Sequence, residues 1–223
     1  FFLYGHFEEA KKRFMPIYNE QCGKTEYGYR AWLRMTTMAN ISHDIPAGRA
    51  LAAAAVARSC AMDAGQKKKE GEIATGTIST GYYVDAEAAF KKAQGMKEDD
   101  PARPAAWREA ASLYKVALEK APALDAAPEA AMNGAFSYKQ VGDYDQAIEM
   151  YTLFIKEYGS EQNLSKLEKG DSAVTPPKPP NPEKYKERVG YLKQAYDALS
   201  AAYVLFFNYR TAAETYDTIS KNT

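Results

Sequence analysis

Apolar residues recur three and four positions apart along most of the chain, and this period is typical of amphipathic helices. We therefore predict helices at Phe7–Tyr18, Thr25–Asn40, Pro46–Met62, Tyr83–Gln94, Ala105–Glu119, Pro128–Val141, Tyr144–Tyr158, Pro182–Phe206 and Tyr209–Asn222. No segment alternates convincingly as a half-buried strand would. Residues 73–83 include β-branched side chains, but Gly76 and Gly81 favour a loop there. The pattern predicts an all-α fold.

Polar stretches interrupt the helical pattern in three places. Residues 97–104 and 168–184 contain prolines and are interpreted as linkers, the second of them extended near Pro176–Pro182. The charged run at 64–72 is interpreted as the solvated end of a helix.

One spacing of large and small residues recurs: an aromatic residue, an alanine three positions later, and a second aromatic residue four positions after that. Its copies are Phe7–Ala10–Phe14, Trp107–Ala110–Tyr114, Tyr144–Ala147–Tyr151 and Tyr209–Ala212–Tyr216. Residues at this spacing share one helical face. We therefore expect each alanine where two helices cross closely, with the aromatic rings filling the space beside it.

A turn signal precedes the third copy. Gly142 is expected to end one helix in the left-handed conformation that glycine adopts without strain. Asp143 is expected to accept backbone N–H bonds at the start of the next helix. The two residues predict a helical hairpin over Pro128–Ser160.

This hairpin resembles the tetratricopeptide repeat (TPR), a helix–turn–helix unit of about 34 residues. The residues in register are Tyr138, Gly142, Tyr144, Ala147 and Tyr151. The resemblance implies a right-handed superhelical solenoid of antiparallel helix hairpins. The sequence departs from the pattern at Ala131, where the family often has tryptophan, and at Phe154, where it usually has alanine. Residues 25–104 are more divergent and follow only by continuity.

The resemblance divides the chain, residues 1–223, into parts of one array. The expected parts are the second helix of a truncated repeat (1–18), a cysteine-bearing hairpin (22–63), a divergent repeat (82–122), the best repeat (128–160), an insertion with a proline-rich linker (160–182) and a last repeat (183–222). Because Phe1–Ile17 resembles a second helix without its first, we expect the chain to be a fragment of a longer protein.

Composition narrows the classes of partner. Lysine plus arginine and aspartate plus glutamate number 29 each, so the net charge indicates neither nucleic acid nor an anionic membrane as the partner. No apolar run reaches the roughly 18–20 residues of a membrane span. The resemblance to the tetratricopeptide repeat implies that the partners are other proteins.

Candidate chemistry is sparse. Residues 22–25 contain the Gly-Lys-Thr of a phosphate-binding loop, but Tyr18 stands where that motif needs glycine. His6 and His43 have no metal-type partner at helical spacing. The carboxylates are interpreted as solvated and capping residues. We therefore expect no enzymatic activity, no cofactor and no metal.

Cys22 precedes one predicted helix and Cys60 lies near the end of the next. If those helices form an antiparallel hairpin, the two sulfurs meet at its open end, which predicts a disulfide. A disulfide indicates the periplasm or the outside of a cell. The alternative is two unrelated buried thiols in a reducing compartment.

Residues 128–159 resemble the repeats of bacterial cell-envelope scaffold proteins, which hold together outer-membrane assembly, pilus and gliding-motility machines. The cysteine-bearing hairpin and residues 29–44 are closest to the gliding-motility type. The resemblance implies a periplasmic or envelope-associated scaffold without catalysis. A cytosolic TPR adaptor or regulator, an accessory domain of a larger enzyme, and a lipid or peptidoglycan binder remain as alternatives.

In the TPR family the first helices of the hairpins line a concave binding face. The residues that this implies as partner contacts are Met132, Phe136, Lys139 and Gln140 in the best repeat, and Asp197, Ala201 and Val204 in the last. Met132 and Phe136 stand where some relatives place the Lys and Asn of a carboxylate clamp. An apolar partner helix or extended segment is therefore expected in place of a peptide C-terminus.

Overall fold

The computed structural model describes residues 2–205, 211 and 214–218, and in this part of the chain every regular element is a helix. The elements are η1 (Phe2–Tyr4), α1 (Phe7–Gln21), α2 (Glu26–Ile41), α3 (Ile45–Ala57), α4 (Ala64–Gly95), α5 (Arg103–Lys120), α6 (Ala127–Gln140), α7 (Tyr144–Glu157), α8 (Glu161–Lys169) and α9 (Pro182–Leu205). The only β-type pairing described is an isolated bridge between Asp171 and Lys178. The predicted all-α class is confirmed.

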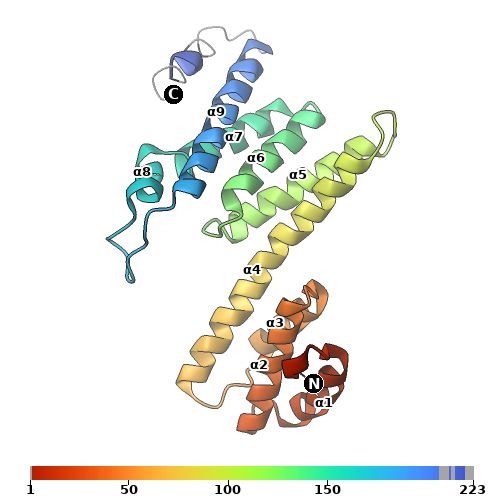
Figure 1. The fold of residues 1–223 in the computed structure, drawn as a ribbon. Coiled ribbons are helices and arrows are strands. Elements are labelled where there is room, and N and C mark those ends of the chain that lie inside the picture. Colours follow the sequence, from red (N-terminus) through yellow and green to blue (C-terminus); the bar gives the residue numbers. More distant parts are fainter. Residues whose placement is uncertain (1, 206–210, 212–213, 219–223) are drawn as a thin grey trace. The chain divides into compact units, whose positions relative to one another are not determined.

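The chain forms two compact units, Phe1–Gly81 and Tyr82–Thr223, whose boundary falls within α4. In the first unit α2 packs against both α1 and α3. In the second unit α5, α6 and α7 pack on one another in sequence order, and α9 packs on α7 and α8 (Figure 1). Neighbouring helices therefore pack in sequence order, as α2 with α3 and α6 with α7 show. The single TPR array itself stays a prediction.

The first unit is built around α2. Thr25 begins this helix by accepting the backbone N–H of Gly28, and Asp44 begins α3 by accepting that of Ala47. Trp32 is fully buried, and its Nε1 donates to the Leu51 carbonyl at 3.1 Å. The indole therefore joins α2 to α3 through both its apolar body and its single donor.

The loop predicted at residues 73–83 is wrong, because α4 continues through it. Gly76 carries no steric demand there, since a Cβ would meet nothing within 4 Å. Each glycine in a helix costs about 1 kcal/mol relative to alanine. Burial of Ala74, with Ile73 packed on the core, offsets that cost. Tertiary packing overrides local propensity in this segment.

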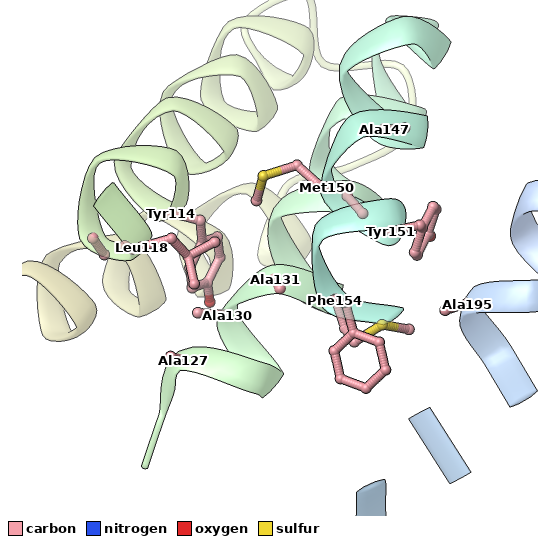
Figure 2. Packing of buried hydrophobic residues seen from close by; sticks show 14 of the residues in the cluster. Tyr114, Leu118, Ala127, Ala130, Ala131, Ala147, Met150, Tyr151, Phe154 and Ala195 are labelled. Atoms are coloured by element: carbon pink, nitrogen blue, oxygen red, sulfur yellow. The ribbon is translucent and has the colours of Figure 1, made fainter. Parts of the chain in front are cut away.

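The second unit has its core among α5, α6, α7 and α9. Figure 2 shows the small Ala127, Ala130 and Ala131 of α6 among larger side chains such as Tyr114 of α5 and Phe154 of α7. Because these alanines are at most 2% exposed, α6 approaches its neighbours closely. The core is thus made by alternating small and large residues across facing helices.

The recurring aromatic–alanine spacing has the predicted packing role in the copies of α1, α5 and α7, whereas Tyr216 of the fourth copy is 51% exposed. Ala10, Ala110 and Ala147 are 2%, 0% and 2% exposed. The aromatic residues beside the last two are buried or half-buried. Tyr209 and Ala212 of the fourth copy lie outside the described residues, as does the predicted helix over most of 209–222.

The turn between α6 and α7 also forms as predicted. Gly142 has a φ of +74°, and the Asp143 carboxylate accepts the backbone N–H of Gln146 at 3.3 Å. Substitution of Gly142 by any residue with a Cβ would therefore place that residue in the left-handed region.

The insertion after α7 contains an element that the sequence pattern did not predict, the short helix α8. Beyond it, residues 172–180 have no regular structure apart from Lys178 in the isolated bridge. Asn181 stands just before α9 and caps it, because its Oδ1 accepts the Lys184 N–H. Its own N–H donates to the Leu167 carbonyl of α8. These bonds hold the C-terminal end of the insertion against α8 and α9.

Candidate functional site

The predicted contact residues of α6 divide into one buried and three exposed side chains. Met132 is 7% exposed and belongs to the core of the second unit. The prediction that it lies on the binding surface is therefore wrong. Phe136 is 40% exposed, and Lys139 and Gln140 are exposed. The α6 surface available to a partner is therefore centred on Phe136.

Phe136 belongs to a cluster of three rings, Phe90, Trp107 and Phe136, which we call the aromatic patch. The Phe136 ring centroid lies 5.6 Å from that of Trp107 and 6.0 Å from that of Phe90. Phe90 and Trp107 meet edge to face at 5.3 Å. These are favourable aromatic geometries, and they fix the orientation of the exposed ring.

One donor within the aromatic patch has no acceptor. Trp107 is 3% exposed, and its Nε1 lacks a hydrogen-bond partner among the described residues. An unpaired buried donor costs about 1–3 kcal/mol. The patch is therefore held together by ring packing, with no compensating polar bond at its centre.

A small acidic hollow adjoins the patch along the same side of α6. It has a volume of about 70 Å³, and Glu87 of α4, Tyr114 of α5, and Glu129 and Asn133 of α6 contribute to its walls. Asn133 Nδ2 donates to the Tyr114 hydroxyl at 3.5 Å, and burial raises the pKa of Tyr114 to about 12. Because Glu129, Asn133 and Phe136 are four and three positions apart, they form one stripe of α6.

The sequence interpretation missed this hollow. The signal was present in the spacing of Glu129, Asn133 and Phe136, but only packing shows that Tyr114 and Glu87 face the same space. Among the described residues no cation forms an ion pair with Glu129. Glu87 pairs with Lys91 at the surface. The stripe is acidic at one end and aromatic at the other.

The predicted contact residues of α9 form a separate surface. Asp197 and Ala201 are exposed, and Val204 is 42% exposed. Their side of α9 is opposite the buried Leu199 and Ala195. The α9 residues thus face away from the core of the second unit, on a different helix from Phe136.

The predicted disulfide is present. Cys22 and Cys60 are bonded, with their Cα atoms 4.5 Å apart, and both side chains are buried. Arg58 Nη2 donates to the Cys22 carbonyl at 2.9 Å. The link joins the end of α1 to the segment after α3, which is the open end of the α2–α3 hairpin as expected.

Glu70 supports this link and was hidden in a charged run of the sequence. It is 3% exposed, and its carboxylate accepts the backbone N–H of Cys60 at 2.7 Å and the hydroxyl of Ser59. A buried carboxylate is retained only where such donors satisfy it. Residues 67–69 of that run are exposed as predicted, whereas Glu70 beside them is buried and structural.

The described residues form neither a metal-binding cluster nor a membrane-spanning helix. Among the described residues, His, Cys, Asp and Glu side chains nowhere gather in threes in a way that could hold a metal ion. None of the described helices combines the length and apolar character needed to cross a bilayer.

Comparison with known proteins found no family model that matches the chain, and no curated protein sequence matches it.

Proposed function

We propose that this chain is a non-catalytic, TPR-like scaffold module that binds other proteins within a bacterial cell-envelope machine, such as a motility or outer-membrane assembly complex. The observation that carries the proposal is the 40% exposure of Phe136. Interfaces concentrate their binding energy in aromatic residues held rigidly at a surface. The ring contacts of Phe136 with Trp107 and Phe90 supply that rigidity.

The surroundings of Phe136 favour a particular kind of partner. Lys139 and Gln140 border the ring with polar groups, while Glu129 lies two turns away on the same stripe of α6. A partner helix or extended segment with an apolar side chain for the ring and a cation for Glu129 fits this order.

The Cys22–Cys60 bond supports the envelope as the compartment, because disulfides persist in oxidising environments. The same fold would serve a cytosolic adaptor, and the redox state of the two cysteines separates these functions. Free thiols in protein trapped with an alkylating reagent in its native cells would favour the adaptor.

The test compares two matched double variants in pull-downs of the native partner. Phe136→Asp with Lys139→Glu should abolish capture. Tyr27→Asp with Lys24→Glu makes the same charge change at another exposed aromatic residue, since Tyr27 is 68% exposed, and should leave capture intact. Equal loss in both variants would contradict a specific site at Phe136.

A folding control is needed because Phe136 also packs on its neighbours. Circular dichroism and thermal unfolding of each variant show whether the fold is kept. If Phe136→Asp unfolds the chain, the surface variant Lys139→Glu with Gln140→Glu leaves every ring contact in place and should still weaken capture. Retained capture by that folded variant would place the partner elsewhere.

A further inference from the structure

The second unit contains a large pocket beside the insertion. Its volume is about 880 Å³, and its walls come from the α5–α6 connection, the end of α7, α8 and the start of α9. Among the apolar side chains that line it are Leu124, Leu153, Leu167, Pro179 and Pro180. Volumes of about 300–1,000 Å³ with mostly apolar walls are typical of small-molecule sites.

Four cations line this pocket, and two of them lack a carboxylate partner. Lys166 pairs with Asp171 at 3.6 Å, and Lys184 pairs with Asp125 at 2.8 Å. The other acid in the wall, Glu157, pairs with Lys156 outside it. Among the described residues, no carboxylate pairs with the two remaining cations, Lys178 and Arg188. The pocket therefore has positive charge left to neutralise.

Arg188 is held in place without a direct ion pair. Its guanidinium lies 5.8 Å from the centroid of the Tyr158 ring, and its Nη1 donates to the Tyr158 carbonyl at 3.2 Å. Burial lowers the pKa of Arg188. A half-buried cation with only a carbonyl acceptor gains from an added anion, because the local environment screens charge less than water does.

Asp125 marks where an anion sits. Its carboxylate is 90% exposed and is held by the Lys184 ammonium. That hydrogen bond lowers the pKa of Asp125, and the charges of Lys178 and Arg188 lower it further. Three cations therefore act on one carboxylate at the pocket. Because so exposed an ion pair contributes little stability, a ligand anion can displace Asp125 at small cost.

We infer that this pocket binds a small anionic amphiphile, a molecule whose apolar body lies against the leucine and proline walls and whose carboxylate, phosphate or sulfonate group takes the place of the Asp125 carboxylate beside Lys178, Lys184 and Arg188. The site lies apart from Phe136 and does not depend on the proposed protein partner.

The experiment uses two fluorescent probes with nearly the same apolar body. The anionic probe is 8-anilinonaphthalene-1-sulfonate, and the neutral one is N-phenyl-1-naphthylamine. Both are titrated against the full chain. The neutral probe reports apolar binding anywhere, including the apolar groove of about 380 Å³ between α1 and α3.

Two variants should change the affinity for the anionic probe in opposite directions. Lys178→Gln removes an exposed cation and should weaken binding of this probe about threefold, whereas Asp125→Asn removes the negative charge that competes with the probe and should tighten its binding about threefold. Binding of the neutral probe should not change. Lys193→Gln on α9, outside the pocket, makes the same charge change as Lys178→Gln and should have no effect.

Three results would overturn the inference. The first is an equal change in affinity for the anionic probe in Lys178→Gln and Lys193→Gln. The second is a lower affinity of Asp125→Asn for that probe. The third is a parallel change in the affinities for both probes. Both informative substitutions replace exposed side chains, so the folded protein can be titrated in each case.

Discussion

Gly134 offers the sharpest test of how closely α5, α6 and α7 pack. It lies in α6, where a Cβ would overlap the Met150 methyl of α7 and stand 3.0 Å from the Tyr114 Cβ of α5. The methionine end can move, but Met150 is only 3% exposed and has little free space around it. Tyr114 Cβ is fixed to its backbone. Gly134→Ala should therefore overpack the crossing.

Two effects of opposite sign decide the result. Alanine is favoured over glycine in a helix by about 1 kcal/mol. Overpacking a well-filled core costs about 1–3 kcal/mol. We expect overpacking to win, so that Gly134→Ala lowers the free energy of unfolding by about 1 kcal/mol.

Gly190 is the matched control. It lies in α9, where an added Cβ would meet nothing within 4 Å. Gly190→Ala should gain only the helix preference and stabilise the protein by roughly 0.5–1 kcal/mol. Urea unfolding followed by circular dichroism measures both variants. If Gly134→Ala is as stable as Gly190→Ala, the three helices are not tightly packed at this crossing, because α5 and α7 could then withdraw without cost.

The other predictions concern the alanine spacing, the disulfide and the buried tyrosines. Ala147→Leu should lower the free energy of unfolding by about 1–3 kcal/mol, and Glu149→Ala should change it by less than about 0.5 kcal/mol; equal melting temperatures would contradict the assigned helix crossing. Replacing both Cys22 and Cys60 by alanine frees a loop spanning 38 residues and should cost about 4 kcal/mol, whereas an unchanged urea midpoint would contradict a stabilising link. Burial raises the pKa of Tyr114 to about 12 from 10.0, so the native state keeps this proton longer than the unfolded chain does. Stability should therefore fall as pH rises from 10 to 12, and Tyr114→Phe should flatten that fall in pH-dependent unfolding; an unaltered slope would show that the phenol is not responsible.

Local signals predicted the hairpins well and the long helix poorly. Period, capping and turn residues act within a few positions, so the ends of α6 and α7 at Gly142 and Asp143 could be read directly from the chain. Helix α4 depends on packing instead. The burial of Glu70 and Ala74 determines where this helix runs, and no local sequence pattern indicates that either residue is buried.

The sequence pattern could predict which helix carries the candidate site but not which of its side chains are exposed. Period placed Phe136 and Met132 on the same predicted strip, because four positions bring residues to nearly one face. The structure separates them, since core packing buries Met132 and leaves Phe136 at 40% exposure. The adjacent hollow requires Tyr114 and Glu87 from two other helices, and no local pattern in α6 specifies those neighbours.

Site-specific photocrosslinking in the native host shows whether the Phe136 surface binds a partner protein. A benzoylphenylalanine at position 136 samples the aromatic patch, and one at position 149 samples the exposed side of α7. If Phe136 binds a partner, position 136 gives a discrete protein adduct that is absent from position 149. No adduct at position 136, or the same adducts from both positions, would contradict it.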